Sequence, residues 1–151
     1  MSERETRARE LFKEGYSCSQ SVLGAYAECL DMEFETLMKI ASSFGGGMGR
    51  LREVCGAVSG MFMVAGYLYG YDSPKDYDGK KQHYARIQEL AGRFREENGS
   101  IICRELLGIE GKDNSPVPSR RTAGYYRKRP CEEMVACAVR ILEAYEATEE
   151  Q

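Results

Sequence analysis

Cysteine is the residue type whose number and placement in this chain indicate chemistry. Four of the six cysteines, Cys18, Cys55, Cys103 and Cys131, stand where the sequence pattern predicts the start of a helix. The first turn of a helix presents unpaired backbone N–H groups and the positive end of the helix dipole, which lower the pKa of a thiol. A single cysteine is often only a small buried apolar side chain, but four at helix starts predict chemistry at sulfur.

These four cysteines are separated by tens of residues, so no two of them form the local Cys-x-x-Cys pair of a zinc ribbon or a thioredoxin. Any shared site must therefore be assembled by the fold. Cys29 lies roughly 16 Å from Cys18 along a helix, too far to share one disulfide or one metal ion. The same spacing argument separates Cys137 from Cys131, so Cys29 and Cys137 are expected in the core.

Composition narrows the class of protein. With 151 residues, the chain has the size of one domain that can bury a core without disulfides. It carries 21 Lys and Arg against 24 Asp and Glu, a net charge of −3, which argues against a nucleic-acid or membrane-surface protein. The charged N-terminal segment lacks the apolar core of a signal peptide and predicts a cytoplasmic protein, whose thiols are kept reduced and serve metal or redox chemistry.

Helical periodicity dominates and strand alternation is absent, so we expect an all-α fold. The chain is expected to form a single domain over 1–151, a bundle of about five to six helices around a buried central helix at about 52–70. Helices are predicted at about 3–14, 17–30, 34–43, 52–70, 74–98, 101–107 and 130–147. The apolar part of the central helix is too short and too glycine-rich for a membrane span. Gly56 and Gly60, one turn apart, allow another backbone to approach.

Two irregular segments are expected beside these helices. Gly45, Gly46, Gly47 and Gly49 form a special turn; it either offers N–H groups to an anion or, as we favour, lets Cys55 approach its partners. Residues 108–130 form a long loop, either a lid that covers the thiols with Tyr125 and Tyr126 or an unstructured surface segment. Its basic residues favour a thiolate or an anionic substrate, or are simply solvated. They are Arg120, Arg121, Arg127, Lys128 and Arg129.

The run 45–49, the sequence Cys-Gly-Ala-Val-Ser-Gly at 55–60 and the remaining helix-start cysteines resemble the C_GCAxxG_C_C family, whose members are proposed to be redox-active. The resemblance spans nearly the whole chain and implies a helical domain whose family cysteines are Cys18, Cys55, Cys103 and Cys131. A similar domain occurs in the split-Soret cytochromes. This chain lacks the Cys-x-x-Cys-His attachment sequence and has 1 histidine, so c-type haem is not expected.

Three functions are compatible with the sequence. The first is a thiol redox protein in which Cys55 attacks and Cys18 resolves the intermediate as a disulfide. As an enzyme, such a protein would be a thiol–disulfide oxidoreductase. The second is a module whose four thiolates hold a zinc ion or an iron–sulfur cluster. The third is a helical interaction protein that forms homo-oligomers and does no chemistry. The redox partner or small-molecule substrate is not identifiable from the chain.

Overall fold

The computed structural model of the chain describes residues 1–108, 115–128 and 130–149, with only the backbone of 126–128. The described residues form eight α-helices and a short 3₁₀ helix, η1 (Ala27–Cys29). The α-helices are α1 (Glu3–Lys13), α2 (Cys18–Ala25), α3 (Phe34–Ser42), α4 (Gly56–Tyr69), α5 (Tyr77–Asn98), α6 (Cys103–Leu107), α7 (Ala123–Lys128) and α8 (Cys131–Glu149). The described part contains no strand beyond one isolated bridge, so the all-α prediction is confirmed.

Local signals explain where several helices begin and end. The Ser17 hydroxyl accepts from the amide of Gln20, while the Gln20 side chain accepts from the amide of Ser17, a capping box that starts α2. The Asp76 side chain accepts from Gly79 at the start of α5. At the other end of α5, Gly99 takes φ 87°, a left-handed cap that glycine adopts without steric cost.

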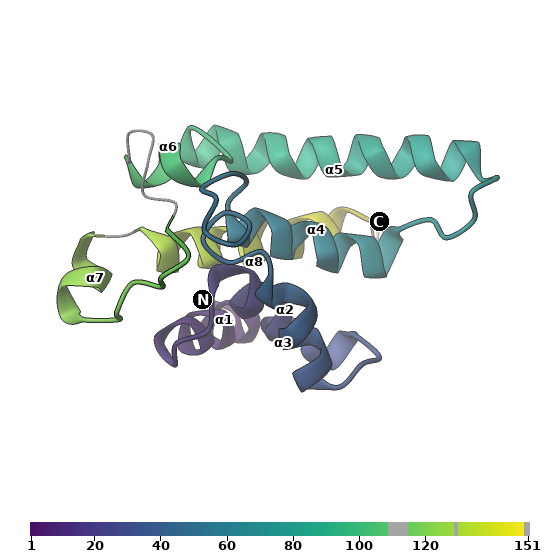
Figure 1. Cartoon of the computed structure of the whole chain (residues 1–151). Helices are drawn as coiled ribbons and strands as arrows, with labels where there is room; N and C mark the ends of the chain where they lie inside the picture. Colours follow the sequence, from purple (N-terminus) through teal and green to yellow (C-terminus); the bar gives the residue numbers. More distant parts are fainter. Residues whose placement is uncertain (109–114, 129, 150–151) are drawn as a thin grey trace.

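The helices lie in tiers, with α5 and α6 on one side, α4 and α8 in the middle, and α1, α2 and α3 on the other side (Figure 1). As predicted, α4 is the central helix, because it packs against α2, α5 and α8. Val58, Met61 and Val64 of α4 are fully buried. None of the described helices combines the length and the apolar character needed to cross a membrane.

Three predicted boundaries are wrong. The central helix starts at Gly56 instead of about residue 52, because the preceding residues form a left-handed turn and an extended segment. The second helix ends at Ala25 and continues only as η1. The expected loop over 108–130 contains α7, whose start is capped by Thr122 accepting from the amide of Tyr125 at 3.2 Å. Part of that loop, at 109–114 and 129, lies outside the described residues.

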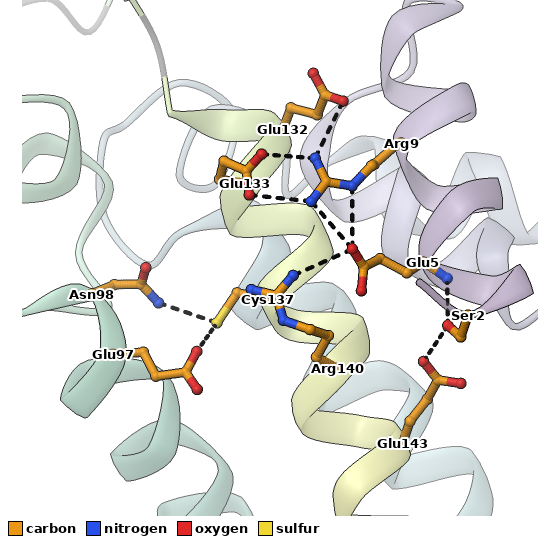
Figure 2. A network of polar contacts seen from close by, with 10 residues as sticks. All are labelled: Ser2, Glu5, Arg9, Glu97, Asn98, Glu132, Glu133, Cys137, Arg140 and Glu143. Carbon is orange, nitrogen blue, oxygen red and sulfur yellow. Dashed lines mark hydrogen bonds and ion pairs between the residues drawn. The ribbon is translucent and has the colours of Figure 1, made fainter.

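An ionic network joins α1 to the first half of α8 (Figure 2). Arg9 of α1 donates to Glu133 at 2.7 Å and to Glu5 at 3.2 Å, and it lies 3.4 Å from Glu132. Arg140 of α8 contacts the same buried Glu5 carboxylate at 3.3 Å. The network therefore fixes the start of α8 against α1, and with it the residue that opens α8.

Candidate thiol site

The four helix-start cysteines open helices as the sequence predicts. Cys18, Cys103 and Cys131 are the first residues of α2, α6 and α8, and Cys55 is the N-cap residue of α4. All four line one cavity of about 70 Å³. A volume of this order has room for a few water molecules, an ion or a small part of a substrate. Residues far apart in sequence are thus brought together at the beginnings of four helices.

The rest of the cavity wall is largely apolar. Phe12, Leu106, Leu107 and Met134 contribute apolar side chains to it. Cys55 and Cys103 are buried, with 5% and 8% of their surface exposed, whereas Cys18 and Cys131 are half-buried. We call the side of the cavity formed by Cys55 and Cys103 its closed half.

Gly56 and Gly60 bring α2 against α4, as the sequence predicts. A Cβ atom added to Gly56 would lie 3.1 Å from the Cβ of Cys18, and one added to Gly60 would lie 2.9 Å from the carbonyl oxygen of Ser19. These distances are shorter than ordinary contacts, so only glycine permits this helix crossing. The two glycines of the Cys-Gly-Ala-Val-Ser-Gly sequence thereby set the Cys18 side chain beside Cys55.

A short backbone pairing holds Cys55 next to Cys103. Val54 and Ile102 form an isolated antiparallel bridge. On either side of it, the amide of Cys55 donates to Ile101 at 2.8 Å and the amide of Cys103 donates to Glu53 at 2.6 Å. No alternation signal in the sequence predicts this pairing, because it involves one bridge only.

The glycine-rich run forms a left-handed turn beneath Cys103. Five consecutive residues take positive φ, namely Gly46 (64°), Gly47 (73°), Met48 (68°), Gly49 (57°) and Arg50 (62°). A Cβ atom at Gly47 would lie 2.6 Å from the Cβ of Cys103, so this residue must lack a side chain for α6 to start where it does. The interpretation of the run as a special turn is thus confirmed, and its binding of an anion stays a prediction.

Cys18 and Cys131 are directly linked. The Cys18 thiol hydrogen-bonds to Cys131, and this bond is the largest cause of a strongly raised pKa at Cys18, followed by burial and by the other cysteines. The hydrogen bond raises the pKa because it stabilises the protonated thiol.

The expected lowering of thiol pKa at helix starts is wrong for Cys18 and Cys55. Burial raises the pKa of Cys55 to about 12, although the amides of Ala57 and Val58 donate to its sulfur and act in the opposite direction. The desolvation of a thiolate in an apolar cavity therefore outweighs the N-terminal N–H groups of α4. At neutral pH both cysteines hold their protons in this closed arrangement.

Two cationic side chains also line the thiol cavity. Arg52 is 5% exposed, and its Nη1 donates to the sulfur of Cys103 at 3.7 Å. Arg121 donates to the carbonyl oxygens of Phe12 and Tyr16, both at 3.0 Å. The sequence analysis did not identify Arg52 as a site residue. The available signal was its position between the glycine-rich run and Cys55. Its φ of 61° is again left-handed, one residue beyond the end of the left-handed turn.

The basic run and the two tyrosines are only partly described. Tyr125 lines the thiol cavity beside Arg121, as a covering residue would. Arg120 is not among the residues that line it. The side chains of Tyr126, Arg127 and Lys128, and all of Arg129, lie outside the described residues.

Cys29 and Cys137 lie away from the thiol cavity. Cys137 is buried in the core, where its thiol donates to Glu97 at 2.8 Å and accepts from Asn98 at 3.3 Å (Figure 2). Cys29 is only half-buried and accepts from Arg4 at 2.6 Å. The prediction of a core position is therefore right for Cys137 and wrong for Cys29, which sits where η1 meets α1.

All six cysteines fall within the described residues, and each is a free thiol. Over residues 1–108, 115–128 and 130–149, no three His, Cys, Asp or Glu side chains lie close enough together to hold a metal ion. The arrangement is thus a cavity with four thiols on its wall, two of them in contact, and a buried guanidinium beside a third.

Neither the curated proteins nor the solved structures contain a significant match to the chain. One family model matches residues 16–145, and its description is "Putative redox-active protein (C_GCAxxG_C_C)". The match covers most of the chain and includes all four cysteines of the cavity. The chain therefore belongs to the C_GCAxxG_C_C family of proteins.

Proposed function

We propose that the protein is a dithiol–disulfide redox protein in which Cys18 and Cys131 form the reactive pair. The observation that carries this proposal is the hydrogen bond between these two thiols on the wall of a cavity shared by all four cysteines. Two sulfurs in hydrogen-bond contact need only a small shift to form a disulfide. As whole residues, both are less buried than Cys55 and Cys103, although burial raises the pKa of the Cys18 thiol itself.

In this proposal Cys131 is the nucleophile, while contact with Cys131 and burial raise the pKa of Cys18 and keep its thiol protonated. Cys131 opens α8, a helix of 19 residues, whose N-terminal dipole favours negative charge on that sulfur. Cys18 then acts as the resolving thiol, the role expected for it from the sequence, while Cys131 takes the attacking role that the sequence reasoning gave to Cys55.

The reaction consumes a disulfide and two protein thiols. The Cys131 sulfur, having released its proton to solvent, attacks one sulfur of a small disulfide R–S–S–R, whose S–S bond breaks. The leaving R–S⁻ takes the proton of Cys18. The Cys18 thiolate then attacks the Cys131 sulfur, which releases the second R–S⁻ to be protonated by solvent. The products are the Cys18–Cys131 disulfide and two R–SH, and the reverse reaction reduces the protein.

The experiment maps the disulfide formed by the reduced protein with excess 2-hydroxyethyl disulfide. Mass spectrometry of peptides generated without reduction should identify Cys18 joined to Cys131. Cys131→Ser should slow thiol loss by about tenfold or more, whereas Cys18→Ser should leave Cys131 trapped as a mixed disulfide. Cys137→Ser is the matched control, since Cys137 lies in the core away from the cavity.

Two results would contradict the proposal. A disulfide between Cys55 and Cys103, with Cys18 and Cys131 still reduced, would assign the reaction to the closed half. Four cavity thiols that remain unreactive with every disulfide would instead favour the non-catalytic helical interaction protein.

The second candidate function is a four-sulfur centre for zinc or an iron–sulfur cluster. Four sulfurs line one cavity of about 70 Å³, and thiolates suit both centres. Because no three such side chains among the described residues lie close enough together to hold a metal ion, binding would have to draw the sulfurs together. Binding of a metal ion would displace the protons that these buried thiols otherwise keep. Elemental analysis and the visible spectrum of anaerobically purified protein test it: stoichiometric zinc or iron supports this function, and a metal-free protein contradicts it.

A further inference from the structure

A second cavity adjoins the thiol cavity and differs from it in chemistry. Its volume is about 330 Å³, and three arginines, Arg50, Arg52 and Arg121, contribute to its wall. Hydroxyl groups of Ser17, Ser42 and Ser119 line it as well. We call this space the arginine cavity.

Two of these arginines have an unfavourable backbone conformation. Arg50 and Arg52 have φ of 62° and 61°, in the left-handed region, which is unfavourable for a residue with a Cβ atom. Such conformations persist where the surrounding structure requires them, and they concentrate at functional sites. Glycine would fill both positions without this cost, but it would supply no guanidinium.

Hydrogen bonds orient the outer guanidinium groups. Arg50 donates to the carbonyl oxygen of Ser115 at 2.5 Å and to the hydroxyl of Ser119 at 2.9 Å. These bonds tie the left-handed turn to the segment that leads into α7. Arg121 is anchored to the end of α1 and stacks on Phe12, with 4.3 Å between its guanidinium carbon and the ring centre. The groups that face the cavity are thus held by elements distant in sequence.

The two cavities share one wall. Ser17, Gly46, Arg52, Arg121 and Tyr125 line both of them. Ser17 immediately precedes Cys18, and Arg52 donates to Cys103. A ligand whose charged end occupies the arginine cavity therefore has its other end within reach of the thiols.

We propose that the arginine cavity binds an oxyanion, a carboxylate or a phosphate, carried by the small disulfide that oxidises the thiols. The inference rests on the proposed function and adds the class of substrate to it. The planar fork of N–H donors on a guanidinium pairs with two oxygens of a carboxylate or of a phosphate through charge-assisted hydrogen bonds.

The first experiment compares three disulfides of similar length and different charge. These are 3,3′-dithiodipropionate with two carboxylates, neutral 2-hydroxyethyl disulfide, and cystamine with two ammonium groups. Each rate of thiol loss is divided by the rate of the same disulfide with free cysteine at the same pH. The normalised rate should be highest for the dicarboxylate and lowest for cystamine.

Arg50→Gln tests the cavity itself, because Arg50 lines the arginine cavity but not the thiol cavity. The ratio of the dicarboxylate rate to the neutral rate should fall by about tenfold. Arg50→Lys, which retains the charge without the forked geometry, should give an intermediate ratio. Arg95→Gln, at an exposed position of α5, is the matched control and should keep the ratio of the unaltered protein. Unchanged ratios in Arg50→Gln, or equal normalised rates for the three disulfides, would overturn the inference.

The second experiment separates this inference from the proposed function. Calorimetry with 3,3′-thiodipropionate, a dicarboxylate without a disulfide bond, measures binding without redox chemistry, and inorganic phosphate is titrated in parallel. Binding that weakens in Arg50→Gln supports the arginine cavity even where all disulfides leave the thiols intact. Reactive thiols with no binding of either anion would retain the redox function and refute the cavity. A preference for phosphate or for the dicarboxylate identifies which oxyanion the substrate carries.

Discussion

Cys55 and Cys103 are fixed to one another through the backbone, because the amide of each donates to a carbonyl oxygen in the segment that carries the other, at 2.8 Å and 2.6 Å. Such a pairing sets the register of the two segments, so the closed half of the thiol cavity is held by the main chain. Cys18 and Cys131 depend instead on how α2 and α8 pack. The distance between the Cys18–Cys131 pair and the Cys55–Cys103 pair therefore depends on how α2 and α8 pack. Substitutions at these helix contacts should have measurable effects.

The close crossing of α2 and α4 predicts opposite results at two glycines of the same helix. Gly60→Ala places a Cβ atom 2.9 Å from the Ser19 carbonyl oxygen and 3.0 Å from the Val22 Cβ. Overpacking of this kind costs about 1–3 kcal/mol. Gly66→Ala meets nothing within 4 Å and should stabilise α4 by about 0.4–1 kcal/mol.

Urea unfolding followed by circular dichroism measures both free energies. Gly60→Ala should also slow the formation of the Cys18–Cys131 disulfide, because α2 must move away from α4 to admit the methyl group. If Gly60→Ala and Gly66→Ala have equal free energies of unfolding, the crossing does not depend on the glycine.

The left-handed turn offers a second matched pair. Gly47 and Gly49 both have positive φ, at 73° and 57°, so alanine at either position loses about 1–2 kcal/mol from backbone conformation. Only Gly47 lies against Cys103, where a Cβ atom would come within 2.6 Å; at Gly49 the nearest atom is 3.7 Å away. Gly47→Ala should therefore lower the free energy of unfolding by a further amount of about 1–3 kcal/mol.

Thermal unfolding compares the two variants, and alkylation by iodoacetamide reports on Cys103. Faster labelling of Cys103 in Gly47→Ala than in Gly49→Ala would show that the turn closes the cavity over this sulfur. Identical labelling of Cys103 in both would contradict that role.

The raised thiol pKa of Cys55 predicts a loss of stability in alkaline solution. Folding raises this pKa from 9.0 to about 12, so between these values the unfolded chain has released the proton that the folded chain retains. The folded state then binds more protons, and the free energy of unfolding falls as pH rises, by up to about 1.4 kcal/mol per pH unit for this group. The contribution is complete below pH 9 and is lost through the interval up to about 12.

Urea unfolding at a series of pH values measures this slope. Cys55→Ala should make the slope shallower, whereas Ser59→Ala, in the same helix, removes a buried hydroxyl that does not titrate and should keep it. Equal slopes in Cys55→Ala and the unaltered protein would show that Cys55 ionises equally in both states.

Local sequence signals were sufficient for most of the helix framework. Ser17 with Gln20, Asp76 and Gly99 are caps that act within a few residues, so their effect is readable without the fold. The spacing of Gly56 and Gly60 also predicted a close helix crossing, and the placement of the four cysteines at helix starts followed from the same local patterns. Thr122 was also a local signal for the start of α7, but the length of segment 108–130 led us to expect a loop.

The electrostatics of the site could not be predicted in this way. A helix start lowers the pKa of a thiol only if solvent or a cation supports the charge, and the burial of Cys55 depends on α2, α6 and α8 together. Left-handed conformations also occur at three residues that are not glycine, Met48, Arg50 and Arg52, which the glycine pattern did not indicate. Both features arise from tertiary packing, and both bear on the chemistry of the cavity.

The ionic network at the start of α8 predicts that Arg9 positions Cys131. Arg9 is largely buried and joins Glu5 of α1 to Glu133 of α8, at 3.2 and 2.7 Å (Figure 2). Arg9→Gln leaves the buried Glu5 carboxylate with only part of its ion pairing, which costs about 1–3 kcal/mol. Arg7→Gln on the same helix removes exposed pairs at 3.8 and 4.0 Å, worth about 0–1 kcal/mol.

Chemical unfolding measures the difference in stability between the two variants, and the rate of Cys18–Cys131 disulfide formation measures the positioning. Of these two variants only Arg9→Gln should slow this reaction, because Arg9 binds the first turn of α8, whereas Arg7 pairs with residues of its own segment. The slowing should persist at low temperature, where both variants are fully folded, since it reflects the placement of one sulfur and not the unfolded fraction. Equal rates in the two variants under those conditions would mean that Cys131 is positioned by the apolar packing of α8 alone.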